Sequence, residues 1–189
     1  MTSAGPVNPA PLTAPIGEVI SSRLRDIPDF PVAGVTFKDF TPLLSDGPAL
    51  RAVVQEIAGR YAGRVDVIVG IEARGLILGA AVAYELGIGF VPVRKAGKLP
   101  GITHSAEYDL EYGSAVIEVH ADAFTGGKRA LVMDDVLATG GTAEAACTLV
   151  EEAGASVEGV EVVLELCFLN GRSKLRGRPV HAMVSVQGP

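Results

Sequence analysis

Two patterns of apolar residues alternate along the chain. Short runs rich in valine, isoleucine and leucine predict strands at residues 65–70, 90–94, 115–120, 129–133, 160–169 and 180–186. Elsewhere apolar residues recur every three or four positions, which predicts helices at residues 16–26, 48–60, 75–86 and 142–153. We expect a loop or short strand at residues 34–41 and a long polar loop at residues 96–113.

The alternation of strands and helices indicates an α/β fold with a mostly parallel central sheet flanked by helices. In such folds, ligands bind at the carboxyl ends of the strands. We expect residues 16–189 to form a single domain. Residues 1–15 contain four prolines but neither a basic residue nor an apolar run, so we expect a disordered tail rather than a secretory signal.

Composition narrows the classes of partner. The chain of 189 residues is 48% hydrophobic and 5% aromatic, and its formal charge of −6 disfavours non-specific binding to nucleic acid or to anionic membranes. A bound phosphate would therefore need a local site. Cys147 and Cys167 lie in apolar surroundings and are expected to be reduced thiols, in keeping with a cytoplasmic location. The most apolar stretch, residues 76–93, is interrupted by Glu85 and Pro92, so we expect a soluble protein without a membrane span.

The segment with the clearest indication of chemistry connects a predicted strand to a predicted helix. Residues 133–142 read MDDVLATGGT. Two glycines let the backbone approach a ligand closely, and threonine hydroxyls together with a helix N-terminus can bind a phosphate. Asp134 and Asp135 can accept hydrogen bonds from a vicinal diol or hold a hydrated Mg²⁺. The alternative is an ordinary strand–turn–helix corner, which the paired acids and the complete run make less attractive.

Two further segments carry candidate anion-binding groups. Residues 70–75, GIEARG, follow a predicted strand, and their arginine can bind an anion bidentately. Residues 93–101, VRKAGKLPG, form a basic cluster in an acidic chain, and residues 108–113 read YDLEYG. For residues 70–75 the alternative is a surface arginine in a connecting loop, and for residues 93–101 it is a solvated, charged strand edge. A loop of this length containing glycine and proline favours a functional role.

Residues 133–142 resemble the 5-phosphoribosyl-1-pyrophosphate (PRPP) motif of the type I phosphoribosyltransferases. The resemblance implies that fold, with a mobile loop at the active site. It also implies a 5-phosphate site at Ala138, Thr139, Gly140, Gly141 and Thr142, with the ribose hydroxyls on Asp134 and Asp135. In this family the segment equivalent to residues 70–75 receives pyrophosphate, which assigns Glu72, Ala73, Arg74 and Gly75 to that group.

The remaining motifs resemble those of adenine phosphoribosyltransferases. Residues 70–75, 93–101 and 108–113 match that group, which places Lys98 near the pyrophosphate and lets Arg94 and Lys95 contribute across a dimer contact. Glu111 would act near the base or the reaction centre. Residues 29–42 resemble the adenine-binding stretch, which lies within residues 16–45. There Thr36 and Lys38 would read the purine edge through main-chain groups, while Phe37 and Leu166 would cover the two faces of the ring.

The resemblance implies an enzyme of purine salvage that converts adenine and PRPP to AMP and pyrophosphate. Mg²⁺ is the implied cofactor, held mainly by PRPP rather than by strong protein ligands, and a homodimer is the expected assembly. One alternative is another purine phosphoribosyltransferase acting on hypoxanthine, guanine or xanthine. The other is a PRPP-sensing regulator without catalysis, but residues 1–15 are too short and uncharged to supply a DNA-binding element.

Overall fold

A computed structural model describes residues 14–109 and 114–188. The internal contacts divide the chain into two compact units, Met1–Glu56 and Ile57–Pro189. We describe each unit by itself. The expectation of a tail at residues 1–15 falls almost wholly outside the described residues, and the single domain stays a prediction.

The first unit is built around a small antiparallel ribbon. Its strands are β1 (Arg25–Ile27) and β2 (Phe37–Asp39), and its helices are α1 (Ile16–Ser21), α2 (Thr41–Ser45) and the start of α3 (Gly47–Tyr61). The predicted helix at 16–26 is wrong beyond Ser21. Arg25 faces Asp39 across the ribbon and Asp26 faces Lys38, and both pairs form salt bridges, at 2.5 and 2.7 Å. These cross-strand ion pairs favour an extended chain where the local apolar spacing favours a helix.

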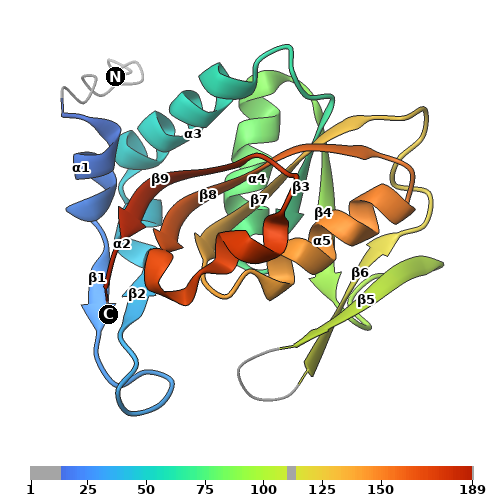
Figure 1. The fold of residues 1–189 in the computed structure, drawn as a ribbon. Helices are drawn as coiled ribbons and strands as arrows, with labels where there is room; N and C mark the ends of the chain where they lie inside the picture. The colour runs from blue at the N-terminus through green and yellow to red at the C-terminus, as the bar shows by residue number, and fades with distance from the viewer. Residues whose placement is uncertain (1–13, 110–113, 189) are drawn as a thin grey trace, which may run out of the picture. The chain divides into compact units, whose positions relative to one another are not determined.

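The second unit contains a seven-stranded sheet (Figure 1). Its strands lie in the order β5-β6-β4-β3-β7-β8-β9. Within this order β4, β3, β7, β8 and β9 pair in parallel. Their bounds are β3 Val67–Ile71, β4 Gly89–Lys95, β5 Thr103–Asp109, β6 Ser114–His120, β7 Arg129–Leu137, β8 Ser156–Leu166 and β9 Val180–Val186. The mostly parallel sheet expected from the alternating pattern is thereby confirmed.

Two helices cover the sheet on opposite faces. Helix α4 (Arg74–Leu86) lies against the face that carries Ile68, because Gly79 of the helix approaches that side chain. Helix α5 (Gly141–Glu152) contributes to the core that contains Val67 and Val69, whose side chains point the other way. Short 3₁₀ turns, η1 (Cys167–Leu169) and η2 (Gly171–Leu175), connect β8 to β9. Among the described residues, no helix is both long and apolar enough to cross a membrane.

Three expectations for this unit need correction. Residues 96–113 are not one long loop, because residues 103–109 form β5, which pairs along its whole length with β6. The polar sequence of β5 gives no alternating signal, so only its partner strand reveals it. β7 runs to Leu137, which places Asp134 and Asp135 inside the strand rather than after it. β8 begins at Ser156 and ends at Leu166, and a 3₁₀ turn occupies the residues that follow.

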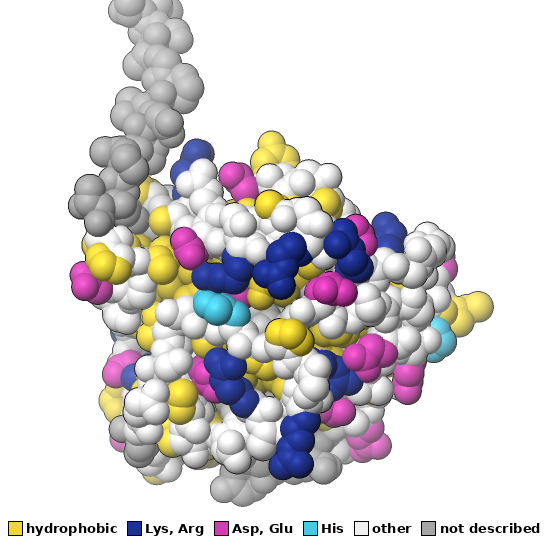
Figure 2. All heavy atoms as spheres, turned by 45° about the horizontal axis from the view of Figure 1, so that its top comes forward, with side chains coloured by type: hydrophobic (Ala, Val, Ile, Leu, Met, Phe, Trp, Pro, Cys, Tyr) yellow, Lys and Arg dark blue, Asp and Glu magenta, His cyan; other side chains and the backbone are white. Residues whose placement is uncertain are grey.

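Acidic and basic side chains alternate over the face seen in Figure 2. Among the described residues, charges of opposite sign form ion pairs, such as Arg178 with Glu151 at 2.7 Å and Arg172 with Glu165 at 2.7 Å. A mixed arrangement of this kind gives this face no broad field of one sign that would attract a polyanion.

Candidate active site

The candidate residues of the second unit gather at the carboxyl ends of neighbouring strands. β4, β3, β7 and β8 lie side by side in the sheet, all in parallel. Glu72 to Gly75 follow β3, Arg94 and Lys95 end β4, and Leu166 ends β8. The acid pair and the glycine loop lie at the end of β7. Parallel pairing thus brings together groups that lie up to 94 residues apart in the chain.

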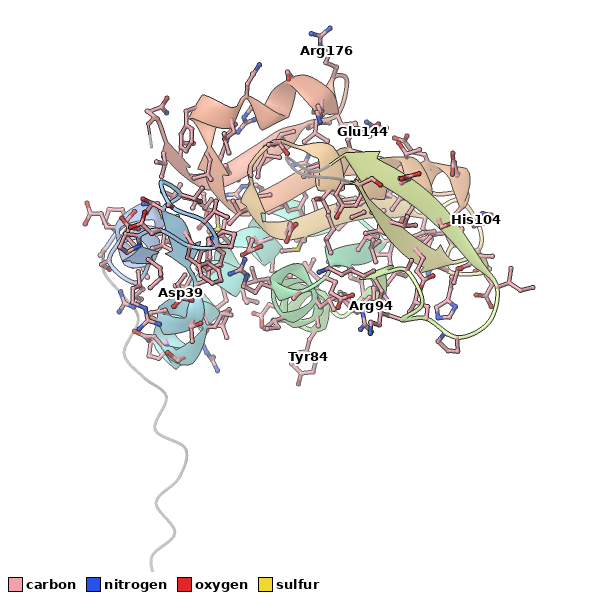
Figure 3. All side chains as sticks on the ribbon, turned by 90° about the horizontal axis from the view of Figure 1, so that it is seen from below. Asp39, Tyr84, Arg94, His104, Glu144 and Arg176 are labelled. Carbon is pink, nitrogen blue, oxygen red and sulfur yellow. The ribbon has the colours of Figure 1, made fainter. Side chains whose placement is uncertain are left out.

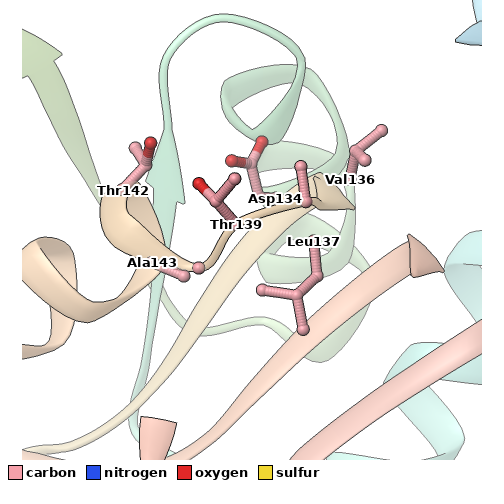
Figure 4. A pocket seen from close by; sticks show the side chains of 8 residues that line it. Asp134, Val136, Leu137, Thr139, Thr142 and Ala143 are labelled. Carbon is pink, nitrogen blue, oxygen red and sulfur yellow. The ribbon is translucent and has the colours of Figure 1, made fainter. Parts of the chain in front are cut away.

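The loop between β7 and α5 forms a pocket of about 60 Å³. This volume is several times the roughly 10–15 Å³ that one water molecule needs, so the pocket has room for a larger anion. In Figure 4 the side chains of Asp134, Thr139 and Thr142 point to the same side of the loop. The full lining is Asp134, Val136, Leu137, Ala138, Thr139, Gly140, Thr142 and Ala143. The pocket therefore includes most of the predicted 5-phosphate residues.

Gly140 gives the loop its shape. Its φ of +81° lies in the left-handed region, and it caps the N-terminus of α5. A Cβ at Gly140 would lie 2.3 Å from the carbonyl oxygen of Gly171, and a Cβ at Gly171 would lie 2.2 Å from that of Ala138. The phosphate loop and the η2 turn are therefore in backbone contact, and each has a glycine at the contact. Gly171 carries no signal in the sequence, because its partner loop lies 31 residues upstream and only the folded chain reveals the contact.

Asp134 lines this pocket and is partly buried, and Asp135 is buried next to it in β7. Asp135 is 5% exposed and its backbone N–H donates to Asp134 Oδ1 at 2.8 Å. Burial raises the pKa of Asp134 well above its usual range, and the neighbouring charge of Asp135 raises it further. A protonated Asp134 would donate a hydrogen bond to a diol, and an ionised one would accept hydrogen bonds from it.

The loop after β3 reaches this acid pair. A Cβ at Gly75 would lie 2.6 Å from the carbonyl oxygen of Met133 and 3.1 Å from the Cα of Asp134, so only glycine allows the close approach. Arg74 Nε lies 2.6 Å from Asp135 Oδ2. That oxygen is buried and, among the described residues, accepts no well-aligned hydrogen bond, so the contact is an ion pair of poor hydrogen-bond geometry. The predicted pyrophosphate and ribose sites therefore meet directly.

Glu72 and Arg94 are tied to each other at the adjoining strand ends. Arg94 Nε donates to Glu72 Oε2 at 2.9 Å, and the backbone N–H of Lys95 donates to the same oxygen at 2.9 Å. The hydrogen bond from Arg94 is the main cause that lowers the pKa of Glu72 below its usual value. Glu72 is thus an anionic partner of the basic segment, which suits positioning better than direct contact with a pyrophosphate.

Known protein families and sequences match this chain over most of its length. The sequence model of the phosphoribosyl transferase domain matches residues 44–186. An adenine phosphoribosyltransferase of Salinispora tropica is 60% identical over 171 residues, which cover 89% of this chain and 90% of the relative. The chain belongs to the adenine phosphoribosyltransferases. The type I phosphoribosyltransferase fold and the enzyme class expected from its motifs are thereby confirmed.

Solved structures of adenine phosphoribosyltransferases have the same fold. The enzyme of Thermoanaerobacter pseudethanolicus aligns with a TM-score of 0.86 at 46% identity, covering 89% of this chain and 99% of that one. The enzyme of Saccharomyces cerevisiae, solved with adenine and an imino-altritol bisphosphate, aligns with a TM-score of 0.85 at 39% identity, covering 89% and 98%.

The predicted adenine-binding residues of this adenine phosphoribosyltransferase lie in both units. In the first unit, the ring of Phe37 meets that of Phe30 edge to face, with centroids 5.2 Å apart. Lys38 Nζ is engaged with Asp26, which leaves its main chain as the group to read a base. Leu166 belongs to the second unit, and Glu111 lies outside the described residues. The roles of these residues stay predictions.

Proposed function

We propose that the pocket between β7 and α5 binds the 5-phosphate of PRPP while the enzyme transfers the phosphoribosyl group to adenine. The observation that carries this proposal is that Asp134, Ala138, Thr139, Gly140 and Thr142 line one and the same pocket. The N-terminus of α5 opens onto the loop, and its free N–H groups and partial positive charge favour a phosphate. The ribose hydroxyls would then reach Asp134 and Asp135.

The pyrophosphate of PRPP would bind on the other side of the acid pair. Arg74 supplies a planar guanidinium that suits a phosphate group. It lies 2.6 Å from Asp135, so an incoming pyrophosphate would compete with that carboxylate. Ala73 and Gly75 would offer main-chain groups to the same ligand, and Arg94, Lys95 and Lys98 would add charge. Glu72 would act here by holding Arg94 in place.

The donor set fits a hydrated Mg²⁺. The buried Oδ2 of Asp135 lacks a well-aligned hydrogen bond among the described residues, and Mg²⁺ prefers carboxylate, water and phosphate oxygens. Asp134 and Asp135 would hold the ion through its water molecules, with PRPP as its main ligand. When bound, the ion would neutralise charge on the departing pyrophosphate.

The reaction would join adenine N9 to the ribose C1 and break the C1–O bond to pyrophosphate, which leaves with the bonding electrons. The proton that adenine loses from its imidazole ring would pass to a nearby base or to water. C1 develops positive charge on the way, which a carboxylate of the acid pair would stabilise. Main-chain groups at Thr36 and Lys38 would read the adenine edge, and Phe37 would cover one face of the ring. Glu111 would take part near the base, and residues 96–113 would close over PRPP and exclude water.

This chemistry recovers free adenine as AMP, which is purine salvage. We place the enzyme in the cytoplasm, where thiols stay reduced, and both Cys147 and Cys167 are free.

The decisive test supplies PRPP and Mg²⁺ with adenine, hypoxanthine, guanine or xanthine and measures nucleotide and pyrophosphate. We expect turnover with adenine. Turnover with another base instead, or DNA binding without any pyrophosphate release, would favour the two alternative functions. At the residue level, Asp134→Asn and Asp135→Asn should each raise the KM for PRPP. Asp66→Asn is the matched control, since Asp66 pairs with Arg129 at the opposite end of the strands. Wild-type kinetics in both site variants would remove the acid pair from the mechanism.

We also propose a homodimer that forms through the outer face of α4. Residues 77, 80 and 84 form one stripe on this helix, which Ala73 extends at the N-cap, and all four are apolar and exposed. Ile77 is 51% exposed and Tyr84 88%, and Figure 3 shows Tyr84 pointing away from the helix. A second copy would cover the same stripe with its own. Sedimentation should give a dimer for the native protein and a monomer for Ile77→Glu. A monomeric native protein would refute this assembly.

A further inference from the structure

A buried carboxylate holds the turn that follows β4. Glu118 lies on β6 and is 6% exposed. Its Oε1 accepts hydrogen bonds from the backbone N–H of Lys98 at 2.9 Å and from that of Leu99 at 2.8 Å. These bonds, led by the one from Leu99, lower the pKa of Glu118 and keep it ionised near neutral pH.

The shape of the turn explains why an acid binds there. Gly97 has a φ of +77°, in the left-handed region, and successive N–H groups after it point to one side. Such a concave arrangement of N–H groups binds anions. Here the protein fills it with its own carboxylate. The N–H of Ala96 is used separately and donates to the carbonyl of Val116 at 2.9 Å.

A second carboxylate holds the other end of the same segment. Glu72 binds the side chain of Arg94 and the backbone N–H of Lys95, as described above. Glu118 differs because, within the turn, it binds backbone N–H groups, and the side chain of Thr103 on β5 adds a further hydrogen bond to it. The ammonium of Lys98 therefore stays outside the Glu118 contact, while the main chain from which it extends is fixed.

We propose that Glu118 is a positioning residue for PRPP binding, because it fixes the backbone of Lys98 and Leu99 and thereby the reach of the Lys98 ammonium. The inference deepens the proposed function, since it rests on Lys98 contacting the pyrophosphate. A lysine on a fixed backbone loses less conformational freedom when it binds a ligand than one on a loose turn.

The experiment combines kinetics with amide hydrogen exchange on Glu118→Ala, Glu118→Gln, Lys98→Ala and the double variant Glu118→Ala/Lys98→Ala. We expect Glu118→Ala to raise the KM for PRPP about tenfold, because shifts of about 1 Å at a binding group can cost up to about a hundredfold. The KM for adenine should change less than twofold. Glu118→Gln keeps an acceptor oxygen and should recover most of the affinity. In the Lys98→Ala background, removing Glu118 should have little further effect on the KM for PRPP.

Amide exchange separates this inference from the proposed function. Exchange at Lys98 and Leu99 should accelerate in Glu118→Ala whether or not Lys98 binds pyrophosphate. Unchanged exchange, or a KM effect that persists in full without Lys98, overturns the positioning role. If Lys98→Ala leaves the KM for PRPP unchanged, the proposed role of Lys98 falls, and the functional half of this inference falls with it. Glu158→Ala, at the far end of β8, is the matched control and should behave as the native enzyme.

Discussion

Replacing Gly171 by alanine tests whether the backbone contact behind the phosphate loop is as tight as its geometry implies. The new Cβ would lie 2.2 Å from the carbonyl oxygen of Ala138, whereas real Cβ atoms stay at least 3.0 Å from such an atom. The loop or the η2 turn must therefore move by at least 0.8 Å. Overpacking of this kind costs about 1–3 kcal/mol of unfolding free energy.

Two other glycines separate the effect of backbone strain from the effect of the steric contact. Gly177 has a φ of +83° with open space around its Cβ position, so Gly177→Ala carries backbone strain alone, about 1–2 kcal/mol. Gly140 combines a φ of +81° with a Cβ contact of 2.3 Å to Gly171, so Gly140→Ala should cost the sum, about 2–5 kcal/mol. Only Gly140→Ala and Gly171→Ala displace the phosphate loop.

The assays are thermal unfolding and steady-state kinetics with PRPP. For Gly171→Ala we expect a melting temperature about 2–12 °C below that of the native enzyme, since each kcal/mol shifts it by about 2–4 °C in a chain of this size. The KM for PRPP should rise by tenfold or more in Gly171→Ala and Gly140→Ala, and stay near the native value in Gly177→Ala. A stable Gly171→Ala enzyme with native PRPP kinetics would refute the contact and its role.

Two further predictions concern titration and thiol reactivity. Hydrogen bonds from Thr41 lower the pKa of Asp39 to about 2, so its stabilising effect is present above its unfolded value near 3.8 and is lost as the pH falls through about 2. Asp39→Asn should flatten the acid side of the stability curve in that window, measured by denaturant unfolding, and an unchanged slope would contradict this. Cys147 is fully buried and burial raises its thiol pKa to about 12, so a thiol reagent at pH 8 should label only Cys167 in the native enzyme and both cysteines after unfolding. Rapid native labelling of Cys147 would be inconsistent with its burial.

The sequence predicts the centre of the site well because local pattern and topology agree there. β-branched runs define the parallel strands, and each candidate motif lies at or just beyond the carboxyl end of one of them. Strands that pair in parallel must bring their carboxyl ends to one edge, so the proximity of Arg74 to Asp135 follows from the alternation of strands and helices.

The supporting residues could not be predicted, because their roles arise only from contacts between distant segments. Gly171 and Glu118 look like an ordinary loop glycine and a strand-edge acid in the sequence. The short β1 and the polar β5 are specified by partner strands rather than by their own apolar spacing. In both, cross-strand pairing determines a structure that local propensity does not indicate.

The ion pair between Arg74 and Asp135 changes what the two acid variants should report. Asp134→Asn replaces a carboxyl whose raised pKa already favours the neutral form, so the fold should tolerate it and the loss should fall on the ribose contact. Asp135→Asn also removes the carboxylate that lies 2.6 Å from Arg74. In this variant Arg74 can bind pyrophosphate without first losing an ion pair, so pyrophosphate should inhibit the enzyme more strongly as a product. The KM for PRPP should still rise. Equal inhibition constants in the two variants would mean that the ion pair does not compete with the ligand.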